Sequence, residues 1–456
     1  MERFDAIVVG TGQAAPALCS RLDKEGLKTA VIERKLLGGT CVNVGCIPTK
    51  TLVASARAVQ SARRGADYGF SVDALRVDMA AVKRRKDEVV RHSSQGVEKW
   101  LAGMKNVTLV RGHARFVSPG TLQVGNRALE AGKIFLNVGG RPLVPELPGI
   151  RDVPVLTSST ILDLDFVPEH LLVIGGSYIG LEFAHMYRRF GSQVTVVERA
   201  PKLLPREDDD VAAGIREILE REGVVIRTGA ECMALARKGE RVAIEMQCKA
   251  GAPLAEGTHV LIAVGRRPNT DDLNLQSTGI KTDERGYIVV DDECRTTEEG
   301  VWALGDCNGR GAFTHTSYND YEIVAANLFD GDRRRISDRI QAYALFIDPP
   351  LGRVGMNEAE AKKSGRRLLA AKMPMSRVGR AREAGEMQGF MKVIVDADSK
   401  ELLGAAILGL NGDEIVHSLL DAMYAREPYT TIQRAVHIHP TVTELVPTLL
   451  GALRPP

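Results

Sequence analysis

The chain has 456 residues, of which 44% are hydrophobic and 26% are charged. A chain of this length is too long for one hydrophobic core and suggests about three domains of roughly 150 residues each. Its 60 basic residues nearly balance its 58 acidic ones, for a formal net charge of +2. This balance calls for neither a nucleic acid nor an anionic membrane surface, so we expect small-molecule partners.

The first apolar strand, Phe4 to Val9, begins almost at Met1, which leaves no room for a signal peptide. Apolar runs such as Leu171 to Ile174 are far shorter than the roughly 20 residues that a membrane span needs. We therefore expect a cytoplasmic protein. In a reducing compartment a close cysteine pair is more often catalytic than structural. The remaining cysteines are scattered singly and are expected to be packing residues: Cys19, Cys232, Cys248, Cys294 and Cys307.

Two segments repeat one pattern, in which an apolar strand, a glycine turn, a helix and a second strand lead to an acidic residue. The first copy turns through Gly10, Gly12 and Ala15 and ends on Glu33. Glycines let the backbone approach a pyrophosphate at the N-terminus of the helix, and the acid is placed to bind ribose hydroxyls. The pattern therefore predicts a dinucleotide site.

The second copy turns at Gly175 and ends on Glu198, but Ser177 stands where the middle glycine is expected. A serine adds only a small side chain beside the phosphate path, so nucleotide binding is still expected. The Glu198 carboxylate favours NAD, because it accepts hydrogen bonds from a free 2′-hydroxyl and repels a 2′-phosphate. Arg199 and Arg206 keep NADP open as an alternative.

Cys41 and Cys46 lie in the most informative stretch, residues 38–50. In an ideal helix, residues five apart have Cα atoms roughly 8.6 Å apart, whereas a disulfide tolerates at most about 7 Å. The pair can bond only if the segment departs from a regular helix, and Gly45 supplies backbone freedom for that. Such a bridge is strained and reducible, which suits a redox carrier. No second Cys or His cluster lies nearby in the sequence to complete a metal site.

The order of these patterns predicts the architecture. A helical stretch at about residues 46–102 follows the first dinucleotide unit, and the chain breaks again near residues 266–269, after the second. Apolar strands after residue 339, followed by a helix at 414–424, indicate a separate α+β domain. We therefore predict an α/β fold with two nested Rossmann-like dinucleotide-binding domains and a C-terminal α+β domain.

The chain resembles the class I pyridine nucleotide-disulfide oxidoreductases, which include dihydrolipoamide dehydrogenase, glutathione reductase, mercuric reductase and the reactive-chlorine-resistance flavoprotein. The resemblance covers essentially the whole chain. It rests on the cysteine segment, the paired nucleotide units, Leu304-Gly305-Asp306 and the run from His439 to Glu444. It implies FAD, NADH or NADPH as cofactors, with NAD favoured, and a homodimer. It also implies four segments: 1–148 and 271–338 for the FAD-binding domain, 149–270 for the NAD(P)-binding domain, and 339–456 for dimerisation.

The resemblance implies catalytic roles for the cysteine pair and for a histidine. Cys46 would lie against the flavin as the charge-transfer thiolate, and Cys41 would be the exposed interchange thiol that meets the substrate. His439, held by Glu444, would be the general acid-base that reaches Cys41 across the homodimer interface.

The resemblance extends to the residues around the cofactors. Lys50 looks like the lysine near the flavin N5, Glu182 like its ion-pair partner, and Tyr178 like the ring that covers the nicotinamide pocket until NAD(P)H enters. The cofactor-binding candidates are Gly10, Gly12, Gln13, Ala14, Ala15, Glu33, Gly39, Thr40, Lys50, Ala114, Gly139, Gly175, Tyr178, Ile179, Gly180, Glu198, Gly265, Gly305 and Asp306.

Sequence differences from individual family members reduce the number of candidate substrates. The chain ends Leu453-Arg454-Pro455-Pro456, without the C-terminal cysteine pair of mercuric reductases, and Thr49 and Glu198 differ from what glutathione reductases carry. The run from Thr314 to Asp320 departs from dihydrolipoamide dehydrogenase, although the His-x-His-Pro-Thr pattern is shared. Residues 47–50, 313–314 and 349–355 look closer to the reactive-chlorine-resistance branch.

We therefore predict an FAD-dependent NAD(P)H oxidoreductase that passes electrons through a Cys41–Cys46 disulfide to a disulfide or metal-ion acceptor. The first alternative is a dihydrolipoamide dehydrogenase of a 2-oxoacid dehydrogenase complex. An alternative of another class is a flavin redox sensor that acts through an acidic protein partner, for which Arg377, Arg380 and Arg382 are the candidate surface.

Overall fold

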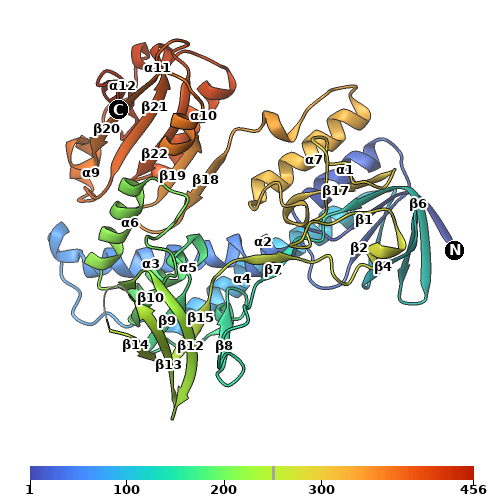
Figure 1. Ribbon diagram of the computed structural model, residues 1–456, viewed down its shortest axis with the longest axis horizontal. Coiled ribbons are helices and arrows are strands. Elements are labelled where there is room, and N and C mark those ends of the chain that lie inside the picture. The colour runs from blue at the N-terminus through green and yellow to red at the C-terminus, as the bar shows by residue number, and fades with distance from the viewer. Residues whose placement is uncertain (249–251) are drawn as a thin grey trace. The chain divides into compact units, whose positions relative to one another are not determined.

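The computed structural model describes residues 1–248 and 252–456, which form two compact units. The first unit comprises Met1–Thr51, Lys83–Leu143 and Gly265–Arg339. The second comprises Leu52–Val82, Val144–Val264 and Ile340–Pro456. Each unit is therefore assembled from segments that are far apart in the sequence, as the mixed colours in Figure 1 show.

The first unit is built on a seven-stranded sheet with the order β3-β2-β1-β6-β5-β4, and β17 also pairs with β6. The strands are β1 (Glu2–Val9), β2 (Thr29–Glu33), β3 (Val107–Arg111), β4 (Ala114–Ser118), β5 (Thr121–Val124), β6 (Arg127–Leu136) and β17 (Val301–Ala303). Side chains of β1 alternate between two cores, since Ile7 packs into one cluster and Val8 into another. A central parallel strand buried on both faces explains the continuous apolar run at the start of the sequence.

Four helices complete the part of the first unit that matters for the site. They are α1 (Ala14–Lys24), α2 (Gly39–Val44), the start of α3 (Cys46–Arg63) and α7 (Thr314–Phe329). α1 and α7 pack against each other beside the sheet. A two-stranded ribbon pairs β7 (Gly140–Pro142) with β16 (Arg266–Pro268).

The second unit contains a five-stranded parallel sheet with the order β11-β10-β9-β15-β8. The strands are β8 (Val155–Thr157), β9 (His170–Ile174), β10 (Gln193–Val197), β11 (Val225–Arg227) and β15 (His259–Ile262). The helices α5 (Tyr178–Phe190) and α6 (Asp209–Arg221) follow β9 and β10. An antiparallel sheet of β12 (Ala230–Lys238), β13 (Arg241–Cys248) and β14 (Leu254–Gly257) is inserted before β15.

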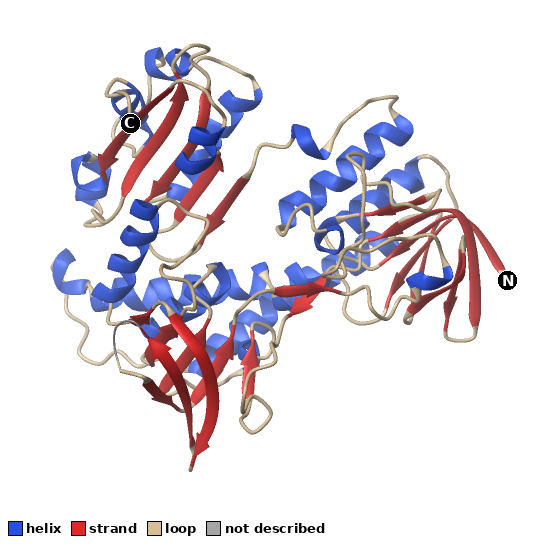
Figure 2. Cartoon of the chain, viewed as in Figure 1, coloured by secondary structure: helices blue, strands red, loops and turns tan. Residues whose placement is uncertain are grey.

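The second unit also contains an antiparallel sheet with the order β18-β19-β22-β21-β20 (Figure 2). Its strands are β18 (Ala342–Leu345), β19 (Leu351–Gly355), β20 (Leu368–Pro374), β21 (Phe390–Asp396) and β22 (Leu402–Leu408). The helix α10 (Gly412–Tyr424) packs on β19 and β22. Shorter helices are α8 (Glu358–Lys363), α9 (Gly379–Glu383), α11 (Tyr429–Arg434) and α12 (Val446–Leu450).

This architecture confirms the predicted fold class. β17 belongs to the first sheet but follows all strands of the second parallel sheet along the chain. The second dinucleotide fold is therefore inserted into the first. The helical stretch predicted at residues 46–102 is interrupted. α3 ends at Arg63 and α4 (Met79–Ala102) begins after an irregular segment, in which Gly69 adopts a left-handed φ of 82°. Asp78 starts α4 by accepting the backbone N–H of Ala81 over 2.9 Å.

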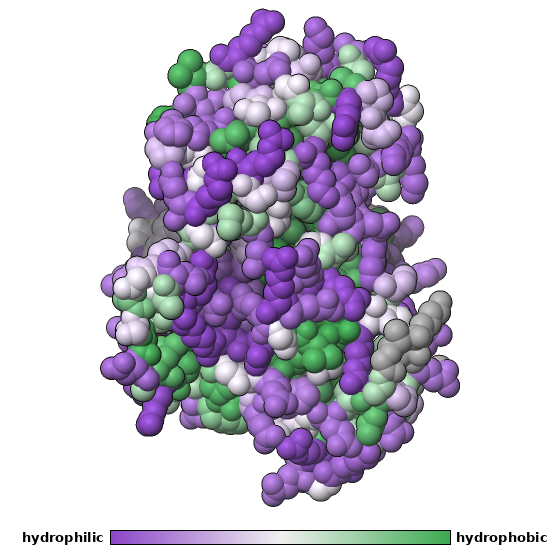
Figure 3. All heavy atoms as spheres, turned by 90° about the vertical axis from the view of Figure 1, so that its left-hand side faces the viewer, coloured by the Kyte–Doolittle hydropathy of each residue, from purple (hydrophilic) through white to green (hydrophobic). Residues whose placement is uncertain are grey.

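Three of the single cysteines, Cys19, Cys294 and Cys307, are buried, as a packing role requires. The side chains of Cys232 and Cys248 lie outside the described residues. Among the described residues, no helix has the length and apolarity to cross a lipid bilayer. The face drawn in Figure 3 is mostly hydrophilic, with hydrophobic residues in small separate patches.

One side of α5 is bound to the segment that joins β18 to β19. Glu182, His185 and Arg189 share this side because they are three and four positions apart. Glu182 Oε1 accepts the N–H of Phe346 over 3.0 Å, and His185 Nδ1 accepts the N–H of Asp348 over 3.3 Å. Arg189 donates to the carboxylate of Asp348. The helix after the second glycine turn is therefore fixed to the C-terminal sheet.

The same network holds Glu222, the residue that caps the C-terminus of α6. Arg189 donates to both Glu222 oxygens over 2.8 and 2.6 Å, and His185 Nε2 lies 3.0 Å from Glu222 Oε2. Burial favours the neutral carboxyl, but Arg189 and His185 outweigh it and lower the pKa of Glu222 to about 2. Burial lowers the pKa of His185 and keeps its Nδ1 free to accept.

The lowered pKa of Glu222 predicts that the second unit loses stability in acid. A lowered folded-state pKa contributes stability that is present above the unfolded value, here 4.5, and is lost as pH falls towards 2. We expect Glu222→Gln to lower the free energy of unfolding by about 2 kcal/mol at pH 6 after allowance for solvent screening, and by less than half of that at pH 3. Thermal unfolding of the variant and the wild type at both pH values measures this difference. Glu217→Gln, which loses only an exposed pair with Arg221, is the control. A cost for Glu222→Gln that does not change with pH would contradict the assignment.

Candidate active site

The first glycine turn, between β1 and α1, leaves no room for side chains. Gly10 has a left-handed φ of 92°, and a Cβ there would lie 2.4 Å from the backbone oxygen of Asn137. A Cβ on Gly12 would lie 2.6 Å from Asn137 Oδ1. Both positions therefore require glycine, for the reason that the sequence pattern predicts.

The acid at the end of β2 organises this turn. Glu33 is buried and accepts the N–H of Thr11 over 3.0 Å and the hydroxyl of Thr11 over 2.6 Å. In this described region, the N-terminus of α1 has neither a capping side chain nor an acid in its first turn. Asn137 Oδ1 is buried beside the turn and has no hydrogen-bond partner among the described residues. A helix N-terminus without a capping side chain, an unsatisfied buried oxygen and a buried acid fit a bound dinucleotide, whose phosphates accept hydrogen bonds and whose hydroxyls donate them.

The second glycine turn, between β9 and α5, repeats this arrangement. Gly175 has a φ of 116°, and a Cβ there would lie 2.4 Å from the oxygen of Ala263. A Cβ on Gly180 would lie 2.1 Å from the oxygen of Gly175. Ser177 is the extended N-cap of α5 and makes no capping hydrogen bond with its side chain. The serine is therefore accommodated without closing the start of the helix.

Glu198 occupies the position of the second acid. Its two oxygens accept the N–H groups of Gly176 and Ala200 over 2.6 and 2.7 Å. The carboxylate is thus held at the end of β10, beside the second glycine turn. Tyr178 and Ile179 begin α5 directly after the turn, and Gly265 follows β15 with a φ of 133°.

The cysteine segment departs from a regular helix at Gly45. α2 ends at Val44, Gly45 has φ −135° and ψ −119°, and α3 begins at Cys46. A Cβ on Gly45 would lie 2.8 Å from the oxygen of Thr40. The chain therefore makes the break that a bond between Cys41 and Cys46 requires.

The two thiols are unbonded in the structure and interact with each other. The hydrogen bond with Cys46, followed by burial, raises the pKa of Cys41, so Cys41 keeps its proton. Cys46 is exposed and Cys41 is half-buried in the protein chain. The sulfur of Cys46 lies 3.2 Å from the hydroxyl of Thr314, the first residue of α7.

The cysteine segment packs directly on the first glycine turn. Gly39 has a φ of 62°, and a Cβ there would lie 2.8 Å from the Cα of Gly12. Asn43 fixes α2 from the other side by donating to the oxygens of Leu37 and Gly39 over 2.8 and 2.9 Å. The structure therefore brings the predicted FAD residues and the predicted redox pair together in the first unit.

Asp306 lies in the short turn after β17 and is linked to a residue that the sequence analysis did not single out. Burial raises the pKa of Asp306, and the guanidinium of Arg266 opposes this from 3.6 Å. Arg266 also donates to Thr40 Oγ1 and to the oxygen of Gly140. Its position at the second chain break was the only available signal, because these contacts exist only once β16 has paired with β7.

Asp320 is a second residue that the sequence analysis did not identify as important. It is buried in α7 and accepts the N–H of Gly305 over 2.8 Å and the side chain of Asn308 over 3.0 Å. Arg339 donates to its other oxygen. Asp320 thus holds the turn that carries Asp306. Polar residues make up at least half of α7 and Glu322 is a second acid in it, so no signal in the sequence singled out Asp320.

The remaining FAD candidates line the same region of the first unit. Ala114 is buried at the start of β4, and Gly139 follows β6 with a left-handed φ of 64°. Gly305 has a φ of 76° and no space for a Cβ beside Ser317 Oγ. Lys50 lies on α3. Its predicted pairing with Glu182 of α5 stays a prediction.

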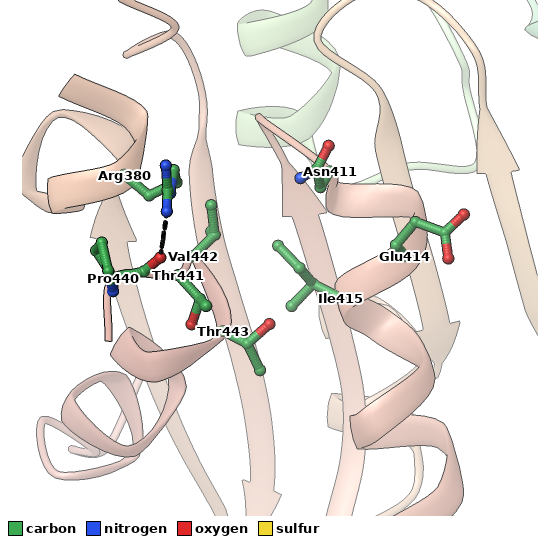
Figure 4. Close-up of a pocket in the computed structure, with 8 residues that line it drawn as sticks. All are labelled: Arg380, Asn411, Glu414, Ile415, Pro440, Thr441, Val442 and Thr443. Carbon is green, nitrogen blue, oxygen red and sulfur yellow. Dashed lines mark hydrogen bonds between the residues drawn. The ribbon is translucent and has the colours of Figure 1, made fainter. Parts of the chain in front are cut away.

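His439 lies in the second unit, in the loop before α12. Its Nδ1 lies 2.9 Å from Glu444 Oε2 and 3.1 Å from Oε1, and the His439 side chain is 80% exposed. Arg380 donates to the oxygen of Pro440 (Figure 4). Together these contacts fix the loop and leave the Nε2 face of the imidazole to solvent.

Two nested dinucleotide folds and a cysteine pair seated on the first glycine turn define a dinucleotide-dependent thiol-disulfide redox protein. A family model described as pyridine nucleotide-disulphide oxidoreductase matches residues 4–320, and its dimerisation domain matches residues 341–450. The chain belongs to this family and is a flavoprotein disulfide reductase. The family uses FAD and NAD(P)H, and the matched dimerisation domain indicates a homodimer.

Individual relatives agree with this assignment. The chain is 36% identical to the probable pyridine nucleotide-disulfide oxidoreductase RclA of Escherichia coli, with 100% of each chain covered. It is 34% identical to a dihydrolipoyl dehydrogenase of Geobacillus stearothermophilus, with 97% of this chain and 94% of the relative covered. The solved Cu(II) complex of the HOCl-induced flavoprotein disulfide reductase RclA from Escherichia coli superposes with a TM-score of 0.90 at 35% identity, covering 99% of both chains.

Proposed function

We propose that the protein is a stress-defence reductase that moves electrons from NAD(P)H through Cys41 and Cys46 to a disulfide or metal-ion acceptor. The observation that carries this proposal is the break at Gly45, which places the two thiols in contact beside the first glycine turn. Similarity to an HOCl-induced reductase solved with Cu(II) supports the stress-defence branch and the metal-ion acceptor.

FAD would be held by the first glycine turn, with Glu33 for the ribose and Asp306 for the ribityl chain, and a hydroxyl of the cofactor or a water would donate to the side-chain oxygen of Asn137. When bound, the flavin accepts hydride from the nucleotide and passes the electrons on. Cys46, the more exposed sulfur, would face the flavin. Cys41 would be the interchange thiol that meets the substrate, and it would need a base to remove its proton, because the contact with Cys46 and burial raise its pKa.

The electrons balance over two half-reactions. NAD(P)H and one proton reduce the Cys41–Cys46 disulfide to two thiols. The dithiol then reduces one substrate disulfide to two thiols, or two Cu(II) ions to Cu(I) with release of two protons, and the bridge re-forms. The described residues of one chain contain no group of three or more metal-ligating side chains, so the metal ion would be a substrate.

The nucleotide would lie at the second glycine turn, with Tyr178 covering the nicotinamide pocket until the nucleotide enters. The Glu198 carboxylate at the end of β10 favours NADH, since it would repel a 2′-phosphate. Lys50 of the first unit would lie near the flavin, and we propose Glu182 of α5 as its ion-pair partner.

The homodimer would complete the active site. His439 and the neighbouring apolar residues Val436 and Ile438 are strongly exposed, at 80%, 101% and 80%. A second copy would cover them and receive His439, oriented by Glu444, as the general acid-base for its Cys41. We also propose the cytoplasm as the location and segments 1–148, 149–270, 271–338 and 339–456 as the domain boundaries.

Two alternatives remain distinguishable by experiment. The dihydrolipoyl dehydrogenase relative supports a lipoamide substrate. A sensor that binds an acidic partner through Arg377, Arg380 and Arg382 is less favoured, because Arg380 already serves Pro440 and Glu383 within the chain.

The acceptor test is steady-state oxidation of NADH and NADPH by the purified enzyme with lipoamide, oxidised glutathione, Cu(II) and Hg(II) in parallel. We expect slow lipoamide turnover and stimulation by Cu(II). Cys41→Ser should lower acceptor turnover by at least about 100-fold and leave flavin reduction by the nucleotide intact. Cys19→Ala, which removes a buried single thiol, is the control. Fast lipoamide turnover would establish the dehydrogenase instead, and no turnover with any acceptor would favour the sensor.

The proposed role of His439 predicts that its loss slows one half-reaction and not the other. We expect His439→Ala to slow disulfide turnover by about 10²–10³-fold, the usual contribution of an acid-base group, with unchanged flavin reduction. Stopped-flow absorbance and steady-state assays separate these steps. His437→Ala is the control, because the Nδ1 of this exposed neighbour lies 3.1 Å from the oxygen of Ala435 and the residue has no proposed catalytic role. Equal slowing of both half-reactions would disprove the role of His439.

A further inference from the structure

Tyr178 is tied to the C-terminal sheet through a shared carboxylate oxygen. Its hydroxyl donates to Glu207 Oε1 over 3.3 Å, and the hydroxyl of Tyr343 in β18 donates to the same oxygen over 2.5 Å. The two rings meet edge to face, with centroids 5.4 Å apart and planes at 79°. One oxygen therefore serves two phenols that come from different parts of the second unit.

Glu207 depends on these two donors. It lies between β10 and α6 and is 3% exposed. Its other oxygen, Oε2, has no hydrogen-bond partner among the described residues, and Nε of the buried Arg353 lies 3.9 Å from it. A buried carboxylate without donors is strongly destabilising, because its lost hydration is not replaced. The phenols of Tyr178 and Tyr343 are thus the hydrogen-bond donors to this carboxylate, and the guanidinium of Arg353 balances its charge.

Both phenols remain protonated donors at neutral pH. Burial raises the pKa of Tyr178 and of Tyr343, and the negative charge of Glu207 raises both further. The hydrogen bonds are therefore of the charge-assisted kind, which is stronger than a bond between neutral groups.

We propose that Glu207 and Tyr343 are positioning residues that set how readily Tyr178 moves aside when the nicotinamide ring enters. This inference rests on the proposed role of Tyr178 as the cover of that pocket. When Tyr178 leaves, its hydrogen bonds to Glu207 and to the hydroxyl of Tyr343 break, but Tyr343 still donates to the same Glu207 oxygen. The buried carboxylate is never left without a donor, so the opening costs little free energy. The C-terminal sheet thereby controls nucleotide entry.

This arrangement predicts opposite effects for the two tyrosines. In Tyr343→Phe, departure of Tyr178 leaves Glu207 without a phenol, so we expect about tenfold weaker binding of a nucleotide that carries the nicotinamide ring, or about 1.4 kcal/mol. In Tyr178→Phe the ring leaves without breaking this bond, so binding should be at least about threefold tighter than in the wild type. In the double variant, Tyr343→Phe should add nothing to Tyr178→Phe.

The test is calorimetric titration of the flavin-bound enzyme with two probes. Tetrahydro-NADH carries a partly saturated nicotinamide ring that donates no hydride, whereas ADP-ribose lacks the ring and needs no movement of Tyr178. We expect Tyr343→Phe to weaken only tetrahydro-NADH. The control is Tyr187→Phe, which removes a buried hydroxyl of α5 bonded to the oxygen of Ile161 over 3.1 Å, and it should change neither affinity. If NADPH is the preferred nucleotide, the tetrahydro-NADPH and 2′-phosphorylated ADP-ribose pair replaces these probes.

Equal weakening of both probes, an unchanged affinity for tetrahydro-NADH, or additive effects in the double variant would overturn the proposal. If Tyr343→Phe does not fold, Tyr178→Phe alone decides, because an affinity no tighter than the wild type contradicts the mechanism. Failure of the proposed nucleotide site is distinguishable, since the wild-type flavin would then not be reduced by NADH or NADPH at all, whereas a different electron acceptor would leave both affinities unchanged.

Discussion

The close approach of Gly39 to Gly12 is the contact on which the chemistry of this protein depends. Any side chain on Gly39 would collide with the backbone of the first glycine turn, 2.8 Å away. This contact seats α2, and the break at Gly45 then turns the chain so that Cys46 begins α3 beside Cys41. Two backbone constraints, neither of which involves a reactive atom, therefore place the redox pair at the dinucleotide turn.

Polar residues from distant segments hold this arrangement. Asp320 of α7 fixes the Gly305 turn, Arg266 of the ribbon joins Asp306 to Thr40, and Asn137 at the end of β6 lies under both Gly10 and Gly12. In the second unit, α5 is fixed along one side to the segment between β18 and β19. The helix that follows the second glycine turn is thus held by hydrogen bonds to the C-terminal sheet. A change in the sheet can therefore move this helix and alter the nucleotide site.

The sequence predicted the features whose causes are local. The glycines at 10, 12 and 175 follow from backbone approach, Glu33 and Glu198 from their place at strand ends, and the break at Gly45 from the distance that a disulfide tolerates. The nested fold class could also be predicted from the sequence, because the dinucleotide pattern occurs twice and the chain breaks again after the second copy. The roles of the single site residues and the domain boundaries stay predictions.

The residues that the sequence analysis missed act through tertiary contacts. Arg266, Asn137 and Asp320 are recognisable only when β16, β6 and α7 have come together, and apart from the chain break at Arg266 nothing in their neighbourhood in the sequence marks them. The same holds for Glu207 and Tyr343, which are 136 positions apart and meet on one oxygen. Ser177 shows the reverse, since this departure from the glycine pattern is accommodated by extended backbone without a capping hydrogen bond from the side chain.

The most direct test of the central claim is an anaerobic titration of the oxidised enzyme with dithionite, followed by absorbance. A flavin and a redox-active Cys41–Cys46 disulfide each take two electrons, so we predict four electrons per bound flavin in the wild type and two in Cys46→Ser. An uptake of two electrons by the wild type would show that the cysteine pair does not exchange electrons with the flavin, and would disprove its redox role.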